Sequence, residues 1–301
     1  MISKQAIAEW FRGLQDRICR GLEELDGTGR FAEDQWTRPE GGGGRSRVIE
    51  GAVIEKGGVN FSAVHGPMPE RIHQALGLPP SDFFATGVSI VLHPRSPMVP
   101  IIHMNVRYFE TQSHSGTKNT WWFGGGIDLT PHYIVQEDAR RFHLRLKDVC
   151  DSHHPEWYAR FKKWADDYFF LKHRNETRGV GGIFFDRLNE AEGKSKAEIF
   201  DFVKNVGEAF VPAYAEQVAA GLPKTYGQRE LEWQALRRSR YVEFNLLWDK
   251  GTRFGLDTDG RTESILMSMP PLAKWKYNHS PEPGSPEAET QELLRKGIEW
   301  V

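Results

Sequence analysis

The 301-residue chain has few cysteines, no surplus of either charge and no long apolar run. Its two cysteines, Cys19 and Cys150, allow one disulfide at most, which excludes a disulfide-stabilised scaffold and favours a reducing compartment. With 39 basic against 41 acidic residues, it lacks the charge signature of nucleic-acid or acidic-membrane binding. No apolar run approaches the ~20 residues of a membrane span. The first twenty residues carry Glu9 and Asp16, so we expect neither integral membrane association nor a secretory signal peptide.

Several catalytic and cofactor motifs are missing as well. The sequence has no G-x-S-x-G nucleophile elbow, no zinc-type cysteine pair, no H-E-x-x-H helix and no glycine-rich dinucleotide fingerprint. We therefore expect neither flavin nor nicotinamide chemistry. What the chain does have is an excess of aromatic residues, with 10 Trp and 18 Phe, beside 30 Gly. This excess fits either a thick core or a pocket for a large flat ligand.

Hydrophobic periodicity predicts a mixed fold. Apolar residues at helical spacing predict an N-terminal helix that is capped by Ser3 and ends near Asp26. Further helices are expected over 137–150, 156–172, 196–220 and 229–238, with Trp164 in the core, and strands over 86–93, 101–109, 121–128, 183–186, 241–248 and 265–269. Because the strands form two clusters separated by helices, we expect one α+β domain over residues 1–301 with a largely antiparallel sheet.

The strand expected over 101–109 has one polar face. Side chains alternate along a strand, so His103, Asn105 and Arg107 share a face while apolar residues occupy the other. An outer sheet face more often carries Thr, Lys or Glu, so this row indicates a binding wall. Arginines hold carboxylates by charge-assisted hydrogen bonds, and aromatic walls cover a flat ligand, which together suit a large, partly apolar polyanion. Three further arginines in expected loops offer the same chemistry: Arg45, Arg47 and Arg261.

Two glycine clusters, at 41–44 and 124–126, are candidate sites of close backbone approach. The first either exposes N–H groups toward an anion or forms a plain surface loop. The second interrupts an aromatic strand, which is typical of a bulge or of a place where a ligand meets the backbone. Asp128 follows directly and would lie beside such a ligand, unless it only caps a following helix.

Four segments resemble the signatures of the oxygen-dependent coproporphyrinogen III oxidases. They are WWFGGGIDLTP at 121–131, KHRNETRG at 172–179, RYVEFNL at 240–246 and GRTESILMSMPP at 260–271. The resemblance runs from the N-terminal helix to Trp300. It implies a large flat antiparallel sheet flanked by helices, and a homodimer. It also implies oxidative decarboxylation of two propionates of coproporphyrinogen III to vinyl groups, giving protoporphyrinogen IX in haem biosynthesis, with O₂ as co-substrate.

The resemblance also assigns roles to residues. His103 matches the proton donor, Asp128 matches the aspartate placed against the pyrrole N–H groups, and Arg107 would orient the propionates as the third catalytic residue. The positions that match substrate contacts are Ser89, Asn105, Val106, Arg107, Gly260 and Arg261. The strands expected between 241 and 276 match the dimer-forming region. Because no mitochondrial presequence is visible, a cytoplasmic location is expected.

These observations leave open whether the protein binds a metal. The family works without flavin or nicotinamide, although some bacterial members are described as manganese-dependent. The histidines matching the ligands proposed for such a metal are His93, His103, His143 and His173. Their wide spacing carries no metal-binding signature of its own, and scattered hydrogen-bonding histidines explain it as well.

Two other functions stay open. The chain would be a non-catalytic tetrapyrrole-binding protein if it bound coproporphyrin without O₂ uptake. It would be a metal-dependent oxygenase with another substrate if it needed iron or manganese together with His93 and His143.

Overall fold

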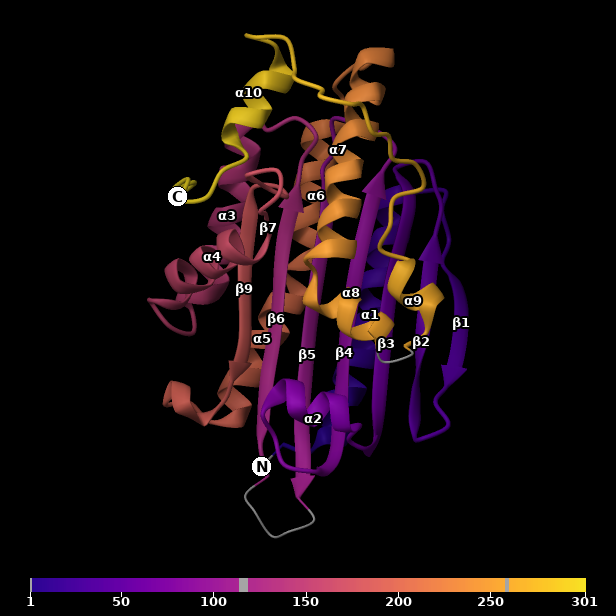
Figure 1. Ribbon diagram of the computed structural model, residues 1–301, viewed down its shortest axis with the longest axis vertical. Coiled ribbons are helices and arrows are strands. Elements are labelled where there is room, and N and C mark those ends of the chain that lie inside the picture. The colour runs from indigo at the N-terminus through magenta and orange to yellow at the C-terminus, as the bar shows by residue number, and fades with distance from the viewer. Residues whose placement is uncertain (1, 114–118, 258–259) are drawn as a thin grey trace.

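A seven-stranded antiparallel sheet forms the centre of the protein (Figure 1), seen in a computed structural model that describes residues 2–113, 119–257 and 260–301. The strand order is β1-β2-β3-β4-β5-β6-β9, so the first six strands form a meander. Their bounds are β1 Ala32–Thr37, β2 Gly42–Ile49, β3 Ile54–Pro67, β4 Ser81–Pro94, β5 Ile101–Ser113, β6 Trp121–Thr130 and β9 Gly181–Leu188. A two-stranded ribbon pairs β7 (Phe170–Leu171) with β8 (Glu176–Thr177).

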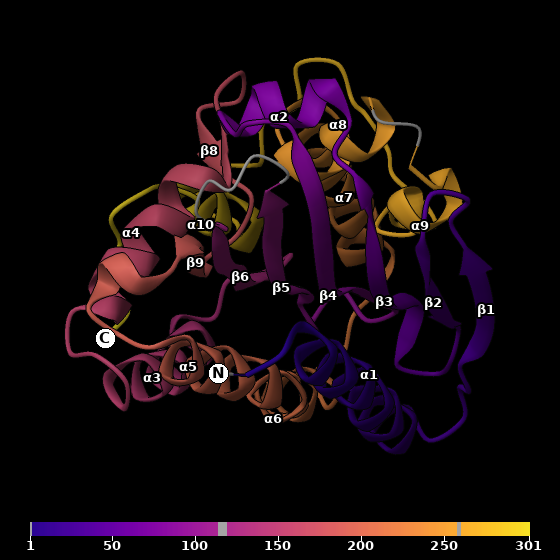
Figure 2. The same cartoon turned by 90° about the horizontal axis from the view of Figure 1, so that it is seen from below.

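Helices cover both faces of the sheet, as the view from below shows (Figure 2). One layer contains α1 (Lys4–Asp26), α3 (Gln136–Asp151), α5 (Lys196–Glu208) and α6 (Phe210–Gly221). The other face carries α2 (Glu70–Leu76), α7 (Gln228–Leu247), α8 (Lys250–Asp257) and α9 (Thr262–Leu266). At the β9 edge lies α4 (Trp157–Tyr168), while the short helices η1 (Glu190–Glu192) and α10 (Pro286–Leu293) complete the described elements. None of the helices in the described ranges is long and apolar enough to cross a membrane.

The two faces of the sheet differ in chemistry because side chains alternate along each strand. On the α1 side, fully buried residues such as Ile90, Met104 and Ile127 pack with Phe11 and Leu14 of α1 in the main core. We call this the core face. The residues between them point to the α7 side, which we call the polar face.

Most of the predicted elements are confirmed. The α+β class and the antiparallel sheet are as expected, and α1 begins where Ser3 accepts a hydrogen bond from the Ala6 N–H. The predicted helix over 196–220 is divided at Ala209 into α5 and α6. The glycines of 42–44 are not in a loop but inside β2, because all three pair with β3 and the last two also pair with β1.

Two strand predictions near the C-terminus are wrong. Residues 241–247 belong to helix α7, which begins at Gln228 and ends at Leu247, with Trp248 as its C-cap. Residues 265–266 are the end of α9, and 267–269 follow that helix. The physical reason lies in the burial pattern, since Tyr241, Phe244 and Asn245 are buried at three- and four-residue spacing, which is the repeat of a helix. The expected loop that carries Arg261 lies partly outside the described residues, which omit 258–259.

Candidate functional site

The polar face carries a line of polar residues that stand directly opposite one another on neighbouring strands. The pairing register joins Asp34 to Ser46, Ser46 to Asn60, Asn60 to Ser89 and Ser89 to Asn105. We call these five residues the polar row. Strands lie about 4.8 Å apart, so the polar row extends about 19 Å across β1 to β5. The polar row is therefore an extended polar surface, and the pairing register of the strands, not a local motif, brings its residues together.

Next to the polar row lies a buried charged cluster of His103, Asp128 and Arg178, which we call the buried centre. His103 stands opposite Asp128 in the β5–β6 register, and its Nδ1 lies 2.7 Å from Asp128 Oδ1. Arg178 follows β8 and donates from Nη2 to both carboxylate oxygens, at 2.9 and 2.8 Å. The side chains of Asp128 and Arg178 are only 1% and 2% exposed. Asp128 therefore acts as the acceptor at the middle of this cluster and does not cap a helix.

Aromatic rings hold Arg178 in place. Its guanidinium lies 4.4 Å from the centroid of Phe169, 4.6 Å from that of Tyr241 and 4.7 Å from that of Phe244. Its Nη1 also donates to Asn245 Oδ1 at 2.9 Å. Cation–π contacts are strongest where water is excluded, as here. Helix α7 supplies two of the three rings and the Asn245 acceptor, and Phe169 at the end of α4 supplies the third ring, so together they fix the cation opposite Asp128.

The electrostatics of the buried centre favour an ionised Asp128. Burial by itself would raise the pKa of this carboxyl, but the Arg178 cation and the His103 hydrogen bond outweigh it and hold the pKa below its ordinary value. Because the carboxylate only accepts hydrogen bonds, His103 Nδ1 must carry the hydrogen between them. The other ring nitrogen, Nε2, is then available for proton transfer, and the His103 side chain is 20% exposed.

Arg107 lies on the polar face of β5 and spans two strands. It donates from Nη1 to Asn105 Oδ1 at 2.7 Å and from Nη2 to Asp186 Oδ1 of β9 at 2.9 Å. Gly124 of β6 leaves the room for this, since a Cβ there would lie 2.8 Å from Arg107 Nε. The glycine cluster at 124–126 thus serves a close approach, in this structure by an arginine side chain.

Arg261 lies at the opposite end of the polar row. Its Nη2 donates to Asp34 of β1, and its Nη1 lies 3.4 Å from Ser264 Oγ and 3.5 Å from Ser46 Oγ. Gly260 precedes it where a Cβ would lie 2.7 Å from the Gly255 carbonyl oxygen, so a side chain would not fit. We call the pairs Arg107–Asp186 and Arg261–Asp34 the arginine arms.

The structure brings most of the predicted site residues together on one face. Ser89, Asn105 and Arg107 line the polar face, with Gly260 and Arg261 beside it. Val106 is the exception, because its side chain is fully buried in the core on the other face and only its backbone can take part. Arg45 and Arg47 also point away, toward Asp16 of α1 and Glu33. Those two arginines are structural ion-pair partners and do not belong to the site.

The four histidines considered as metal ligands are not brought together. His93 Nε2 contacts the Ser268 carbonyl oxygen at 2.8 Å, and His103 contacts Asp128. His143 lies in the core layer, between the Tyr158 hydroxyl and the Val180 carbonyl, both at 2.9 Å. Burial lowers the pKa of His93 to about 3 and that of His143 to about 4, so both are neutral hydrogen-bonding groups. Within the described ranges, no three His, Cys, Asp or Glu side chains form a group that could hold a metal ion.

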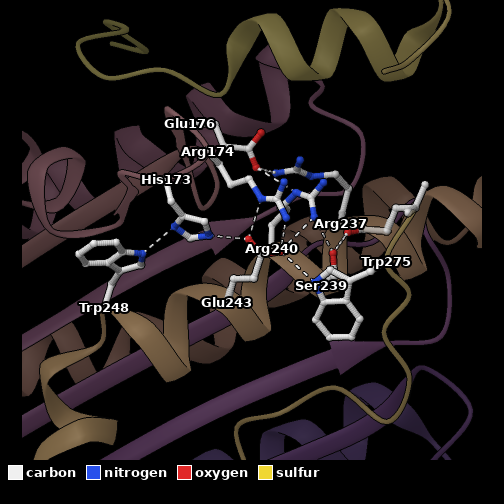
Figure 3. A network of polar contacts seen from close by, with 10 residues as sticks. His173, Arg174, Glu176, Arg237, Ser239, Arg240, Glu243, Trp248 and Trp275 are labelled. Atoms are coloured by element: carbon white, nitrogen blue, oxygen red, sulfur yellow. Dashed lines mark hydrogen bonds and ion pairs between the residues drawn. The ribbon is translucent and has the colours of Figure 1, made fainter. Parts of the chain in front are cut away.

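His173 belongs to a separate network around Glu243 (Figure 3). The Trp248 indole donates to His173 Nδ1 at 2.9 Å, so the histidine Nε2–H donates to Glu243, at 2.7 Å. Glu243 also accepts two hydrogen bonds from Arg174 and one from Trp275. Burial acts against its charge, but Arg174 and His173 bring the pKa of Glu243 down to about 2. This network anchors α7 to the 173–176 segment and does not reach the polar row.

Sequence reasoning missed several members of the site. Arg178 and Asn245 were noticed only inside longer motifs, and Asp34 and Asp186 were not singled out at all. A fully buried arginine needs a buried acid as its partner, but the burial of Arg178 is seen only in the folded structure, so the sequence offered no local signal for this pair. Trp164, expected in the core, is 39% exposed because α4 lies at the sheet edge, where its ring packs on Phe184 of the polar face.

Comparison with known families agrees with this geometry. The family model described as coproporphyrinogen III oxidase matches residues 6–300, nearly the whole chain. A match of this extent includes every strand of the sheet, the buried centre and both arginine arms. The chain therefore belongs to the coproporphyrinogen III oxidase family, an oxidoreductase family of haem biosynthesis.

Proposed function

We propose that this protein is the oxygen-dependent enzyme of its family and converts coproporphyrinogen III to protoporphyrinogen IX. The observation that carries the proposal is the arrangement of the polar face, where an ionised buried centre adjoins a long polar row with an arginine at each end. Family membership supports coproporphyrinogen III as substrate and oxidative decarboxylation as the reaction.

The proposed reaction balances for each of the two propionates. The side chain R–CH₂–CH₂–COO⁻ reacts with O₂ and one proton to give R–CH=CH₂, CO₂ and H₂O₂. The C–C bond to the carboxylate breaks, its electron pair enters the new C=C bond, and the hydrogen lost from the neighbouring carbon leaves together with two electrons. O₂ accepts those electrons and is reduced to peroxide. Porphyrinogen pyrroles are electron-rich, so the substrate itself can pass electrons to O₂.

Substrate recognition follows from the arginine arms. Arg261 contacts Ser46 of β2 and Arg107 lies on β5, so the strands that carry them are about 14 Å apart across the sheet. Coproporphyrinogen carries its four carboxylates on the rim of a wide ring, and guanidinium groups bind carboxylates in bidentate fashion. Two propionates on opposite sides of the ring would pair with Arg107 and Arg261, and the ring would lie over Asn60, Ser89 and Asn105.

Proton transfer is assigned to the buried centre. Asp128 holds the His103 ring with Nδ1–H toward the carboxylate, which leaves Nε2 to give or take a proton at the exposed edge. A carboxylate has about four acceptor positions, and three of those on Asp128 are used by His103 and Arg178. The fourth would accept a pyrrole N–H and raise the electron density of the ring. Of the four histidines considered as metal ligands, only His103 takes part in the proposed proton transfer, because the other three contact separate partners.

The oligomeric state and the cellular location of the protein are part of the same proposal. We propose a homodimer formed through the region 241–276, which contains helices and an extended segment in place of the expected strands and exposes Leu247, Leu272 and Trp275. We also propose a cytoplasmic location, which suits two free, buried cysteines whose thiols burial keeps protonated by raising the pKa of each to about 12.

The proposal is tested by turnover of coproporphyrinogen III in air and under argon, each with and without a chelator. We expect protoporphyrinogen IX and one H₂O₂ per vinyl group in air, and no product under argon. Equal turnover under argon would contradict oxygen dependence. Tight binding without product in air would instead establish the non-catalytic tetrapyrrole-binding alternative, and loss of turnover with chelator would establish that the reaction requires a metal.

A further inference from the structure

Each arginine proposed to bind a substrate carboxylate already has a carboxylate partner from the protein. Arg261 donates to Asp34, and Arg107 donates to Asp186 at 2.9 Å. The two aspartates come from opposite edges of the sheet, β1 and β9. Asp34 therefore forms one end of the polar row, and Asp186 contacts Arg107 near the other end.

These two ion pairs are open to solvent, unlike the pair in the buried centre. The side chains of Arg261 and Asp34 are 33% and 58% exposed, and those of Arg107 and Asp186 are 36% and 33% exposed. Ion pairs in such positions are held weakly because water and salt screen them. An aspartate carboxylate and a propionate carboxylate are also the same functional group, so one can replace the other on a guanidinium with little change in geometry.

We propose that Asp34 and Asp186 are placeholder carboxylates, which occupy the two carboxylate subsites until a propionate displaces them. The inference rests on the proposed function, in which Arg107 and Arg261 bind propionates. In the free protein, each aspartate keeps its arginine extended over the polar row. The serine or asparagine oxygen beside it would hold the arginine less firmly on its own. Each aspartate also competes with the substrate for its arginine. A ligand with a single carboxylate therefore gains little affinity from binding there.

The competition also acts after the reaction. A propionate that has become a vinyl group no longer pairs with an arginine, and the neighbouring aspartate can then re-form its ion pair. Asp34 and Asp186 thus favour departure of the less carboxylated product while admitting the tetracarboxylate. These residues are specificity-determining positions for the proposed reaction.

The test uses Asp34→Asn, Asp186→Asn and the double variant, which remove the charge with minimal change of shape. Fluorescence quenching measures the Kd of coproporphyrin III, the stable oxidised form of the substrate. Exposed pairs of this kind correspond to about two- to five-fold in affinity. We expect each single variant to bind coproporphyrin III about two- to five-fold more tightly and the double variant more tightly still. Binding of the coproporphyrin tetra-amide should not change.

A matched control separates displacement from general charge effects. Glu33 is adjacent to Asp34 on β1 but pairs with Arg47 and points to the other face, so Glu33→Gln changes the net charge equally without freeing a site arginine. We expect its Kd to equal that of the wild type. If the wild type binds coproporphyrin III but the aspartate variants bind it equally or more weakly, the placeholder role alone is overturned. A wild type that fails to bind coproporphyrin III would overturn the proposed function and this inference with it.

Discussion

The buried centre and the arginine arms use the same chemistry in opposite surroundings. In the buried centre, Arg178 and Asp128 are almost completely removed from water, whereas the four side chains of the arginine arms are 33% to 58% exposed. A charge pair in the interior interacts far more strongly than the same pair at the surface, where the dielectric is high. The difference teaches that burial, more than distance, separates a fixed catalytic geometry from an exchangeable ligand contact.

The cost of removing one partner should differ in the same way. A buried ion left without its partner costs about 3–5 kcal/mol, whereas an exposed pair contributes about 0.2–1 kcal/mol. The buried centre also has three aromatic rings around Arg178, while the arginine arms depend on serine and asparagine oxygens.

The largest expected effect is on turnover. Asp128→Asn removes the charge that orients His103, so proton transfer should fail while the ring still fits. Positioned acid–base catalysis contributes about 10²–10⁴-fold in rate, and we expect kcat to fall within that range. Steady-state kinetics with coproporphyrinogen III measure it, and the Kd of coproporphyrin III serves as the control for an intact site. Near-normal kcat would remove Asp128 from the mechanism.

The next largest effect is on stability. Arg178→Met leaves Asp128 buried without its cation, and we expect the free energy of unfolding to fall by about 3–5 kcal/mol in urea titrations. The double variant Arg178→Met, Asp128→Leu should recover much of this loss, because no uncompensated charge then remains. Asp34→Asn in an arginine arm should change the same quantity by less than about 1 kcal/mol. Equal losses at the two sites would contradict the contrast.

A smaller effect is expected on substrate affinity. Arg261→Gln removes one charge-assisted contact, worth about 1.5 kcal/mol or about ten-fold, so KM should rise about ten-fold with kcat nearly unchanged. Arg47→Gln is the control, since Arg47 lies on neighbouring β2 but pairs with Asp16 and Glu33 away from the polar row. A fall in kcat without a change in KM would show that Arg261 does not act in binding.

The smallest effect is a pH dependence of stability that belongs to Asp128. Burial alone would raise its pKa, but Arg178 and His103 lower it by more, so the folded pKa lies below the unfolded one. Such a carboxyl contributes stability that is complete above the unfolded pKa, about 3.9, and is lost as pH falls through the folded pKa. The stability difference between wild type and Asp128→Asn should therefore shrink as pH falls below about 4. A difference that is constant from pH 6 to 3 would exclude an ionised Asp128.

Local periodicity was enough to predict much of this site. The alternation of His103, Asn105 and Arg107 along one strand requires only the two-residue repeat of a β-strand, and the polar face is where it was expected. The long motifs gave Asp128 and Arg261 by resemblance. The antiparallel sheet was also predicted, because the expected strands form clusters separated by helices and do not alternate with helices one by one.

The part of the site that was not predicted depends on contacts between residues far apart in the sequence. Arg178 lies 50 residues after Asp128, and Arg261 lies 227 residues after Asp34, so no local pattern pairs them. The register that aligns Ser46, Asn60 and Ser89 is equally invisible to a single-strand pattern. Helix α7 was mistaken for a strand over 241–248 because its aromatic and β-branched residues favour strands, while its burial against Arg178 has a helical repeat.

The most direct test of the account is a crystal structure with coproporphyrin III bound. We expect the ring over the polar row, one carboxylate paired with Arg107 and another with Arg261, and the pyrrole nitrogens facing the buried centre. Asp34 and Asp186 should have turned away from their arginines. A macrocycle bound elsewhere, or bound with both aspartates still paired to Arg261 and Arg107, would contradict the account.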